Sequence, residues 1–512
     1  MGNATDLSPA SSDARLPLTL LPLPRRERAA IRHVTLLLVL RGVIVAGGVA
    51  TAALVPRTMG PATYGRYDLI TMLTFWFCML GGLGTGQVTS RQAPELEAAG
   101  AAGRLQALFG NFLVLRVLSS AVVAVLYFLV TRLWLRDLDW AALLILSAVV
   151  LLRGPGSLCY ALFLGQGRIG RWAIPEVVRQ WGSVVFSLPC FLVGGLRGAV
   201  VGYLISETVI VAIAVLGVRR SLTWRSLRPD VAAVAPLLKV GLAFWASELV
   251  FSAIDRSGAV LVRSVTRDYA QVGLFGVSYQ VFMAAVLSTN QISSSFVAIL
   301  TVLRARGEEA ELKAWVERLV KWLAVLAVLG FLGTLLLGGD VIPLVLGPAY
   351  RPVVANMIAL AATMLLLPLA QVCSLLALTH DRPGTLLRAA VLRLLCFWGL
   401  GVPLVMRWGS LGACLAVLAA FAAQAAYFVV KNRAVMGPAF RRWAEVIAGG
   451  LSLAPLALLR GGPWSNVALY LVAAGGYLVV LRGLGVISRR ELAAVYRSLG
   501  TAKQRDDAEG AP

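Results

Sequence analysis

The sequence predicts an all-α integral membrane protein with about 14 transmembrane helices, arranged as two pseudo-symmetric six-helix lobes followed by two further helices. Composition is the first observation behind this prediction. Of the 512 residues, 59% are hydrophobic and only 14% are charged, whereas soluble proteins have roughly 25% charged residues. Second, apolar stretches of about 20 residues, the length that crosses a bilayer as a helix, follow one another almost without interruption. Third, a weak internal repeat relates the two halves of the chain.

Hydropathy gives the order of the helices, and the mean hydropathy of the chain is +0.80. Six are expected near residues 34–55, 68–88, 107–131, 140–163, 174–194 and 199–218. Six more are expected near 238–262, 271–302, 319–338, 353–378, 386–406 and 410–430, and two near 444–460 and 465–484. The segment 271–302 is long for one span, so we expect it to be tilted or to extend into the charged stretch 301–321.

The predicted domains follow from these helices. The apolar run at 16–24 is short, is broken by prolines and precedes basic residues, whereas a signal peptide has its basic residues first. We therefore interpret residues 1–30 as a cytoplasmic tail. The remaining segments are an N-lobe (31–218), a cytoplasmic linker (219–237), a C-lobe (238–432), the last two helices (433–485) and a second tail (486–512).

The distribution of basic residues predicts the orientation in the membrane. With the N-terminus inside, the predicted inner loops hold 20 Lys and Arg residues and the outer loops hold ten. Cytoplasmic loops are the more basic in membrane proteins. We therefore expect both termini in the cytoplasm.

A faint repeat supports two related lobes. Arg168 and Arg382 lie in similar short segments after the fourth and tenth helices, 214 residues apart. Gly198 and Gly412 precede the sixth and twelfth helices at the same spacing. The pairs Tyr64–Gly65 and Val272–Gly273 are 208 residues apart, as a short insertion would produce. Parallel repeats of this kind place a substrate site between the two halves.

The strong positive charge does not indicate nucleic acid in a chain of this composition. The net charge of +22 is explained more simply by basic loops against anionic lipid headgroups, so membrane lipids are the expected partners and nucleic acid is not. The six cysteines all lie in apolar segments without CxxC spacing, and only two histidines are present, so no metal site is expected. The GxGxxG motif at 165–170 follows a helix rather than a strand, so no dinucleotide or other cofactor is predicted.

Six arginines lie inside the predicted helices: Arg41, Arg116, Arg153, Arg179, Arg256 and Arg393. An arginine at the centre of a membrane helix costs about 2.5–3.5 kcal/mol on insertion scales, so lipid-facing placement is unfavourable. We expect these side chains to face the protein interior or a water-filled cavity. A cavity lined by arginine favours an anionic cargo, so the sequence predicts a transporter.

Structural roles are the alternative for these arginines. Some could extend to the membrane surface or pair with nearby acids. Arg179 follows Glu176 by three residues, so an ion pair within one helix explains it equally well. Arg41, Arg116 and Arg153 have no acid within one helical turn, and we expect these three to line a cavity.

Acids are fewer inside the predicted helices. Glu207 lies in the sixth helix, and Glu248 and Asp255 share one face of the seventh, seven residues apart. These three are candidates for binding a coupling proton or sodium ion. Alternatively, Asp255 pairs with an arginine across the lobe interface, which the neighbouring Arg256 favours. The glycine-rich segment 81–86 is interpreted as close helix packing or a loosened helix end.

Three segments resemble a known family. Residues 57–67, RTMGPATYGRY, are similar to the R-x-L-G-P-x-x-Y-G-x-Y signature of bacterial polysaccharide flippases, with Met59 in place of the usual leucine. Asp255–Arg256 followed by VGLF at 272–275 resembles that family's DR…VGLY stretch, and LGPAYR at 346–351 resembles its GxxY segment. The resemblance covers roughly residues 30–435.

The resemblance implies the fold of the multidrug/oligosaccharidyl-lipid/polysaccharide exporter superfamily, which is that of the MATE transporters. It also implies a flippase that moves undecaprenyl-pyrophosphate-linked oligosaccharide across the inner membrane by alternating access, for surface polysaccharide biosynthesis. Polysaccharide polymerase and glycosyltransferases would then be functional partners. The six arginines suit a pyrophosphate, because guanidinium groups bind phosphate oxygens bidentately.

Three other functions were weighed. A multidrug exporter of the same superfamily would favour acidic or aromatic cavities, and here buried arginines outnumber buried acids. A lipid II flippase fits the helix count, but the opening sequence pattern of that branch is missing apart from an arginine in the first helix. A membrane polysaccharide polymerase or ligase usually has a large polar periplasmic loop, and the predicted outer loops here are short. We therefore expect no enzyme activity.

Overall fold

The computed structural model describes residues 23–166, 169–218, 231–379 and 383–486. Every regular element within these ranges is helical. The first half contains α1 (Leu23–Leu80), α2 (Thr85–Ala98), α3 (Ala102–Trp134), α4 (Trp140–Gly165), α5 (Ile169–Gly182), η1 (Ser183–Ser187), α6 (Leu188–Val218), α7 (Val231–Arg256) and α8 (Gly258–Thr266). The second half contains α9 (Tyr269–Ser294), α10 (Val297–Ala305), α11 (Glu309–Leu346), η4 (Pro348–Tyr350), α12 (Val353–Met364), α13 (Leu367–Thr379), α14 (Pro383–Trp408), α15 (Ser410–Lys431), α16 (Arg433–Leu451), η5 (Ala454–Leu459) and α17 (Pro463–Gly483).

Ten of the described helical segments are long and apolar enough to cross a membrane, or up to eleven if the bent pair α12 and α13 forms one span. Two of these segments, Gly42–Leu80 and Ala173–Val218, contain an interruption at a glycine, so each consists of two arms. The chain is thus a multi-pass, all-helical membrane protein, as predicted. The count of 14 spans and the predicted domain boundaries stay predictions.

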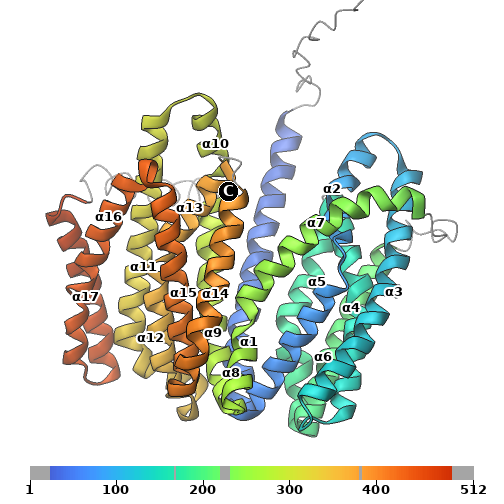
Figure 1. Cartoon of the computed structure of the whole chain (residues 1–512), viewed down its shortest axis with the longest axis horizontal. Helices are drawn as coiled ribbons and strands as arrows, with labels where there is room; N and C mark the ends of the chain where they lie inside the picture. Colours follow the sequence, from blue (N-terminus) through green and yellow to red (C-terminus); the bar gives the residue numbers. More distant parts are fainter. Residues whose placement is uncertain (1–22, 167–168, 219–230, 380–382, 487–512) are drawn as a thin grey trace, which may run out of the picture.

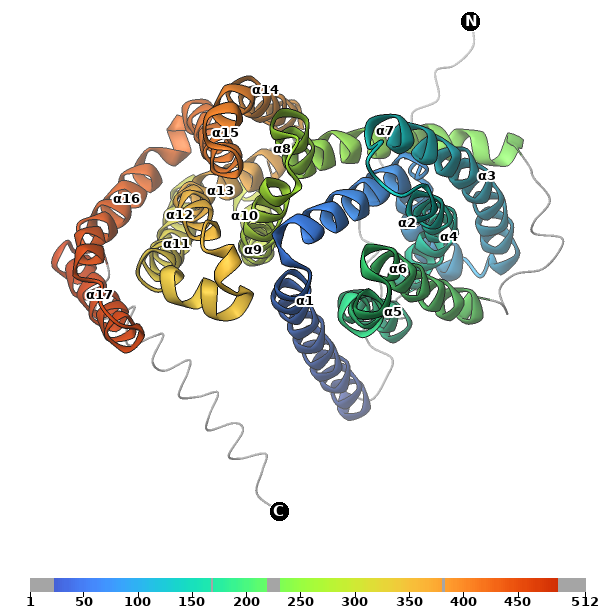
Figure 2. The same cartoon turned by 90° about the horizontal axis from the view of Figure 1, so that it is seen from below.

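The helices form two groups that lie side by side (Figures 1 and 2). The N-lobe contains α1 to α6, and the C-lobe contains α9 to α15. Helix α7 runs diagonally between them in Figure 1, contacting α2 and α3 on one side and α14 on the other. Helices α16 and α17 pack on α11 at the far edge of the C-lobe. The predicted all-helical architecture is therefore confirmed, while the assignment of six helices to each lobe stays a prediction.

Helix α1 makes a sharp bend that joins the two lobes. Its two arms, residues 23–59 and 61–80, meet at Gly60, whose φ of 73° and ψ of 163° are not helical. Glycine adopts positive φ without steric strain, and the following Pro61 has the fixed φ suited to a first helical position. Hydropathy assigned residues 56–67 to a loop between the first two spans. In the structure these residues are helical except at Gly60.

The second arm of α1 crosses α9 at a pair of glycines that are related by the internal repeat. A Cβ at Gly65 would collide with the carbonyl oxygen of Tyr269, and a Cβ at Gly273 would collide with the carbonyl oxygen of Pro61. Each glycine thus contacts the carbonyl four residues before the other. Such a reciprocal contact is what a local two-fold axis produces. The two copies of the predicted repeat, at Tyr64–Gly65 and Val272–Gly273, therefore contact each other between the lobes.

The second repeat, with its spacing of 214 residues, also has a geometric counterpart. Gly195 has φ 57° and ψ −143°, and Gly409 has φ 57° and ψ −129°. Beyond these turns, Gly198 packs on the carbonyl of Cys190, and Gly412 packs on the carbonyl of Leu404, again 214 residues apart. The two helical hairpins therefore have the same tight crossing, which requires glycine at the contact.

A second interruption separates α1 from α2. Residues 81–84 form a turn in which Leu83 has φ 48° and Gly84 has φ 69°. A Cβ at Gly84 would collide with the backbone of Gly241 on α7. The predicted helix 68–88 is therefore broken near its end, while the interpretation of 81–86 as close packing at a helix end is confirmed. The carbonyl of Met79 accepts from the backbone N–H of Gly82 at 2.9 Å and from Nε1 of Trp245 on α7 at 2.8 Å.

Candidate functional site

The second arm of α1 lies where the two lobes meet. It packs against α3, α4 and α6 in the N-lobe and against α9 in the C-lobe. One buried cluster includes Leu69 and Phe77 from this arm, Tyr127 from α3 and Val272 and Phe275 from α9. Charged side chains that reach this arm therefore lie between the lobes rather than on the outside of either.

Three of the predicted arginines follow this arm, and we call Arg116, Arg153 and Arg256 the arginine row. The guanidinium carbon of Arg256 is 4.0 Å from the centre of the Phe75 ring, and that of Arg153 is 5.4 Å from it. Two helical turns further on, a Cβ at Gly82 would lie 2.9 Å from Nη1 of Arg116. Two of these arginines therefore meet at Phe75, near the end of α1, and the third reaches the turn at 81–84 that follows this helix.

Arg116 is a buried cation that forms no ion pair among the described residues, although the charge of Glu248 on α7 acts on it. Its residue is 8% exposed, its Nε donates to the carbonyl of Gly154 at 3.1 Å, and its Nη2 donates to Ser157 Oγ at 2.7 Å. Among the described residues, its Nη1 has no hydrogen-bond acceptor and no carboxylate lies within ion-pair distance. A buried charge is unfavourable unless it is paired, so this side chain favours a bound anion.

Arg153 has a partner that the sequence did not connect to it. Its Nη1 donates to Tyr203 Oη at 2.7 Å and lies 3.3 Å from Oε1 of Glu207 on α6. Glu207 is 1% exposed, and its Oε2 has no acceptor or donor among the described residues. This pair has no signature in the local sequence, because the carboxylate comes from another helix, 54 residues further along the chain. Glu207 therefore balances the charge of Arg153.

Arg179 forms the intrahelical pair that its sequence spacing suggested. Nη1 of Arg179 lies 3.0 Å from Oε2 of Glu176, and its guanidinium carbon is 5.0 Å from the centre of the Tyr160 ring. Its Nε is buried without an acceptor among the described residues. The field of Arg179 reaches Cys78 on α1, as do the fields of the two N-lobe arginines of the row. Arg179 thus lies near the row as part of an ion pair.

The remaining predicted site residues are placed as follows. Arg393 on α14 stacks over the Phe421 ring of α15 at 4.7 Å, inside the C-lobe. Glu248 on α7 is exposed and accepts a hydrogen bond from Nε2 of Gln87. The side chains of Arg41 and Asp255 lie outside the described part of the structure.

Asp68 is a membrane carboxylate that the sequence analysis did not select. Hydropathy made it the first residue of a helix, where a charge is ordinary, but the helix resumes at Pro61 and so places Asp68 two turns inside. The sequence feature that could have revealed this helix start is the Gly60–Pro61 dipeptide, because proline is common at a first helical position. Asp68 is half-buried and faces Gly276 on α9.

Contacts between the lobes bridge the end of the molecule at the α1 bend, which we call the elbow face. Nη1 of Arg57 donates to the carbonyls of Leu344 at 3.1 Å and Val345 at 3.3 Å. Tyr350 Oη donates to the carbonyl of Pro56 at 2.8 Å, and burial raises the pKa of Tyr350, so the hydroxyl keeps its proton. The flippase-like segments 57–67 and 346–351 therefore meet at this face.

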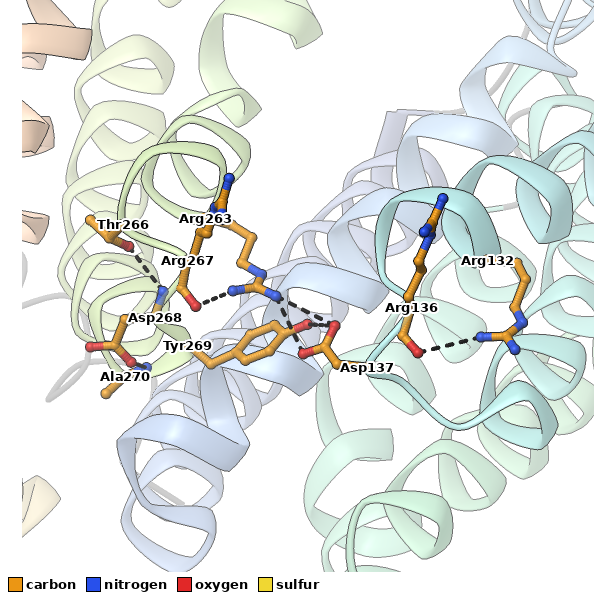
Figure 3. A network of polar contacts seen from close by, with 9 residues as sticks. All are labelled: Arg132, Arg136, Asp137, Arg263, Thr266, Arg267, Asp268, Tyr269 and Ala270. Carbon is orange, nitrogen blue, oxygen red and sulfur yellow. Dashed lines mark hydrogen bonds and ion pairs between the residues drawn. The ribbon is translucent and has the colours of Figure 1, made fainter.

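A second set of contacts crosses the elbow face (Figure 3). The carboxylate of Asp137, in the turn between α3 and α4, lies 3.3 Å from Nη2 of Arg263 and accepts from Tyr269 Oη at 3.1 Å. Arg263 also stacks on the Tyr269 ring at 4.0 Å, and Arg66 on α1 stacks on the same ring at 5.0 Å. We call Asp137, Arg263 and Tyr269 the Asp137 clasp, because it holds the N-lobe turn against α8 and α9.

A family model described as "Polysaccharide biosynthesis protein" matches residues 32–301, which is just over half of the chain. A comparison with curated protein sequences gave no match.

Two solved structures have the same fold. A lipid II flippase, MurJ, in an inward closed conformation superposes with a TM-score of 0.65 at 12% identity, covering 88% of this chain and 99% of that one. A multidrug resistance MATE family transporter of the MOP superfamily, in an inward-facing conformation, superposes with a TM-score of 0.63 at 15% identity. It covers 78% of this chain and 94% of that one. The predicted MATE-like fold is confirmed.

Proposed function

The chain belongs to the polysaccharide biosynthesis protein family, and its fold is that of the two solved transporters. We propose that it is a flippase of the MOP superfamily and that its cargo is undecaprenyl-pyrophosphate-linked oligosaccharide. The product would be a surface polysaccharide, such as O-antigen, exopolysaccharide or capsule. Glycosyltransferases would act before the flippase and a polysaccharide polymerase after it. The observation that carries this proposal is the arginine row, above all the buried Nη1 of Arg116, which has no acceptor among the described residues.

The chemistry of the row fits a pyrophosphate. Arg116 keeps Nη1 free of protein acceptors among the described residues, and Arg256 lies over Phe75 near the same end of α1. Several guanidinium groups near one helix end suit an anion with several acceptor oxygens. The pyrophosphate would bind between the lobes, and the polyprenyl chain would stay in the surrounding lipid. Apolar side chains such as Leu118 and Val122 on α3 are exposed toward that lipid.

The loop charges support an orientation with both termini in the bacterial cytoplasm, so the elbow face would be periplasmic. In the described conformation this face is closed by Arg57, Tyr350 and the Asp137 clasp. The arginine row would then receive cargo from the cytoplasm, where lipid-linked oligosaccharides are assembled. Release would require the clasp to open and the lobes to rock about the glycine crossing of α1 and α9.

The test is transport of a fluorescent short-chain prenyl-pyrophosphate-oligosaccharide by the purified protein in liposomes. Arg116→Ala removes the unpaired guanidinium, and loss of a hydrogen bond to a charged group, about 1.5–3 kcal/mol, predicts a 10- to 100-fold lower affinity. Arg91→Ala is the matched control, because its side chain is 68% exposed. Equal transport by Arg116→Ala, Arg256→Ala and wild type would reject the proposal.

A multidrug exporter is the alternative of the same superfamily. The net positive charge around α1 disfavours a cationic drug, because a desolvated cation beside Arg116 would be repelled. Uptake of a cationic dye that outcompetes the pyrophosphate probe in the same liposomes would favour this alternative. Lipid II also contains a pyrophosphate, so competition by lipid II against other lipid-linked glycans would show which headgroup the site prefers.

A further inference from the structure

The face of α9 that packs on α1 continues beyond the crossing as an exposed face. Gly273, Gly276 and Gln280 lie on this face and contact the second arm of α1. Residues three, four and seven apart share one face of a helix. The same steps along α9 lead to four residues that are all exposed: Ala284, Leu287, Gln291 and Ser294. Because this face contacts the N-lobe arm at the crossing, its exposed continuation is directed toward the space between the lobes.

This exposed continuation is polar without being charged. Apart from Ala284 and Leu287, it consists of amides and hydroxyls, and we call the following residues the polar face of α9: Gln280, Ser288, Gln291, Ser294 and Ser295. No charged residue and no histidine occurs at 269–303. The segment Tyr269–Ala305 is nevertheless apolar and long enough to cross a membrane. Exposed amides and hydroxyls are unfavourable against lipid, which offers no hydrogen-bond partners, so this face is suited to water or a polar ligand.

The polar face of α9 offers both hydrogen-bond acceptors and donors. The hydroxyls of its three serines donate to carbonyls of α9 itself, at 2.8 Å to 3.0 Å, and each hydroxyl oxygen keeps its capacity as an acceptor. Oε1 of Gln280 accepts from Tyr64 Oη at 3.2 Å, which leaves the Nε2 donors of that amide without an acceptor among the described residues. A sugar hydroxyl both donates and accepts, so a mixed and neutral surface of this kind matches it.

The internal repeat shows that this polarity is not a requirement of the fold. The repeat spacing of 208 residues relates Gln280, Ala284, Leu287 and Gln291 to positions on α1 and the turn after it, and these positions are apolar: Met72, Trp76, Met79 and Leu83. Of the two equivalent segments, only α9 therefore presents uncharged polar groups. Such a difference indicates contact with a polar ligand rather than helix packing.

Trp76 links the polar face of α9 with the arginine row. It lies on the α1 face that carries Gly65 and Asp68, which contact α9 at the crossing. Its indole Nε1 is buried and has no acceptor among the described residues. The preceding residue, Phe75, is the ring over which two arginines of the row stack. An indole offers an apolar ring together with one N–H donor, and so suits a sugar ring that carries hydroxyls.

We propose that the polar face of α9 and the indole of Trp76 form a subsite for uncharged sugars of the cargo, beside the arginine row that would hold its pyrophosphate. From Gln280 to Ser295 the face is about 22 Å long at 1.5 Å per residue, so the subsite is extended along the glycan. The two parts of the cargo are then bound by different chemistry, charge at the pyrophosphate and neutral hydrogen bonds at the sugars. This inference rests on the proposed function, because it needs a cargo that carries a glycan.

Two probes of equal charge separate the subsite from the arginine row. One is a short-chain prenyl pyrophosphate closed as its methyl ester, and the other carries a neutral oligosaccharide in place of the methyl group. Each is titrated into the full-length protein in detergent, and the ratio of the two affinities measures the contribution of the glycan. Wild type is expected to prefer the glycan probe by about tenfold or more, since each neutral hydrogen bond contributes roughly 2- to 10-fold.

Variants on the two sides of the subsite test its residues. Gln291→Leu combined with Ser288→Ala is expected to lower the preference for the glycan probe to below about threefold, and Trp76→Phe, which removes only the N–H donor and one ring, to lower it by roughly 2- to 10-fold. Arg116→Ala is expected to weaken both probes and to keep the preference. Thr208→Val is the matched control, because it removes an exposed hydroxyl from α6 and should change neither affinity.

The possible results distinguish this inference from the proposed function. Equal affinity of wild type for the two probes would mean that the polar face of α9 contacts only water, and would overturn the inference while the pyrophosphate site stands. A wild-type preference that persists in both the Gln291→Leu, Ser288→Ala variant and Trp76→Phe would overturn it as well. Failure of either probe to bind would instead reject the proposed function, and this inference with it.

Discussion

The ion pair of Arg153 and Glu207 offers a prediction that separates folding from transport. The side chains are 14% and 2% exposed, and Nη1 and Oε1 are 3.3 Å apart. Arg153→Met removes the cation and leaves the carboxylate of Glu207 buried with Oε2 already lacking a partner. We expect this variant to be strongly destabilised, because the remaining charge has no compensation in the described interior.

The magnitude follows from the burial of both groups. Removing one partner of a buried pair costs about 3–5 kcal/mol, whereas replacing both with apolar side chains of similar volume is close to neutral. We therefore expect a loss of about 3–5 kcal/mol in the free energy of unfolding for Arg153→Met alone. The double variant Arg153→Met with Glu207→Leu should recover most of that loss. The coupling energy of the double-mutant cycle should accordingly be large and favourable.

Denaturant unfolding in detergent micelles measures the stability, and the liposome assay measures transport. Because Arg153 belongs to the arginine row, the stable double variant is expected to transport about tenfold more slowly than wild type. Normal transport by the double variant would show that Arg153 serves only as the partner of Glu207. A single-variant loss below about 1 kcal/mol would refute the assignment of a buried, mutually dependent pair.

Three further predictions concern the frame around the site. Gly65→Ala and Gly273→Ala each push α1 away from α9, so each should lower the free energy of unfolding by about 1–3 kcal/mol. The double variant should lose less than the sum, because both methyl groups separate the same two helices. Asp137→Asn weakens the clasp. In a Phe75→Cys background, it should raise several-fold the rate at which a membrane-impermeant thiol reagent, added at the elbow face, labels the new cysteine. Gly409→Ala forces alanine into φ 57° and should cost about 1–2 kcal/mol in the same unfolding measurement.

Matched controls make these three outcomes decisive. Gly399→Ala places a methyl group in open space on the same helix that ends before Gly409, so it should be neutral or slightly stabilising. Strict additivity of the two crossing variants would argue against a shared contact. Unchanged labelling with Asp137→Asn would mean that the other elbow-face contacts hold the lobes together without the clasp.

Local sequence features determined a large part of this protein. Apolar stretches of membrane-spanning length predicted an all-helical membrane fold, because a backbone in lipid must satisfy its own hydrogen bonds. The segments 57–67 and 346–351 suggested the family, and the structure brings them together at the elbow face. The ion pair of Glu176 and Arg179 could be read from its spacing, because three residues along one helix place two side chains together.

Only the tertiary structure decided which charges meet. Glu207 balances Arg153 from another helix, and Arg256 reaches Phe75 from α7, so neither contact has a sequence spacing that could reveal it. Asp68 was overlooked because hydropathy smooths over the bend at Gly60, which a single positive φ creates. Helix formation depends on neighbours a few residues apart, whereas the energy of a buried charge depends on whatever the folded chain brings within a few ångströms of it.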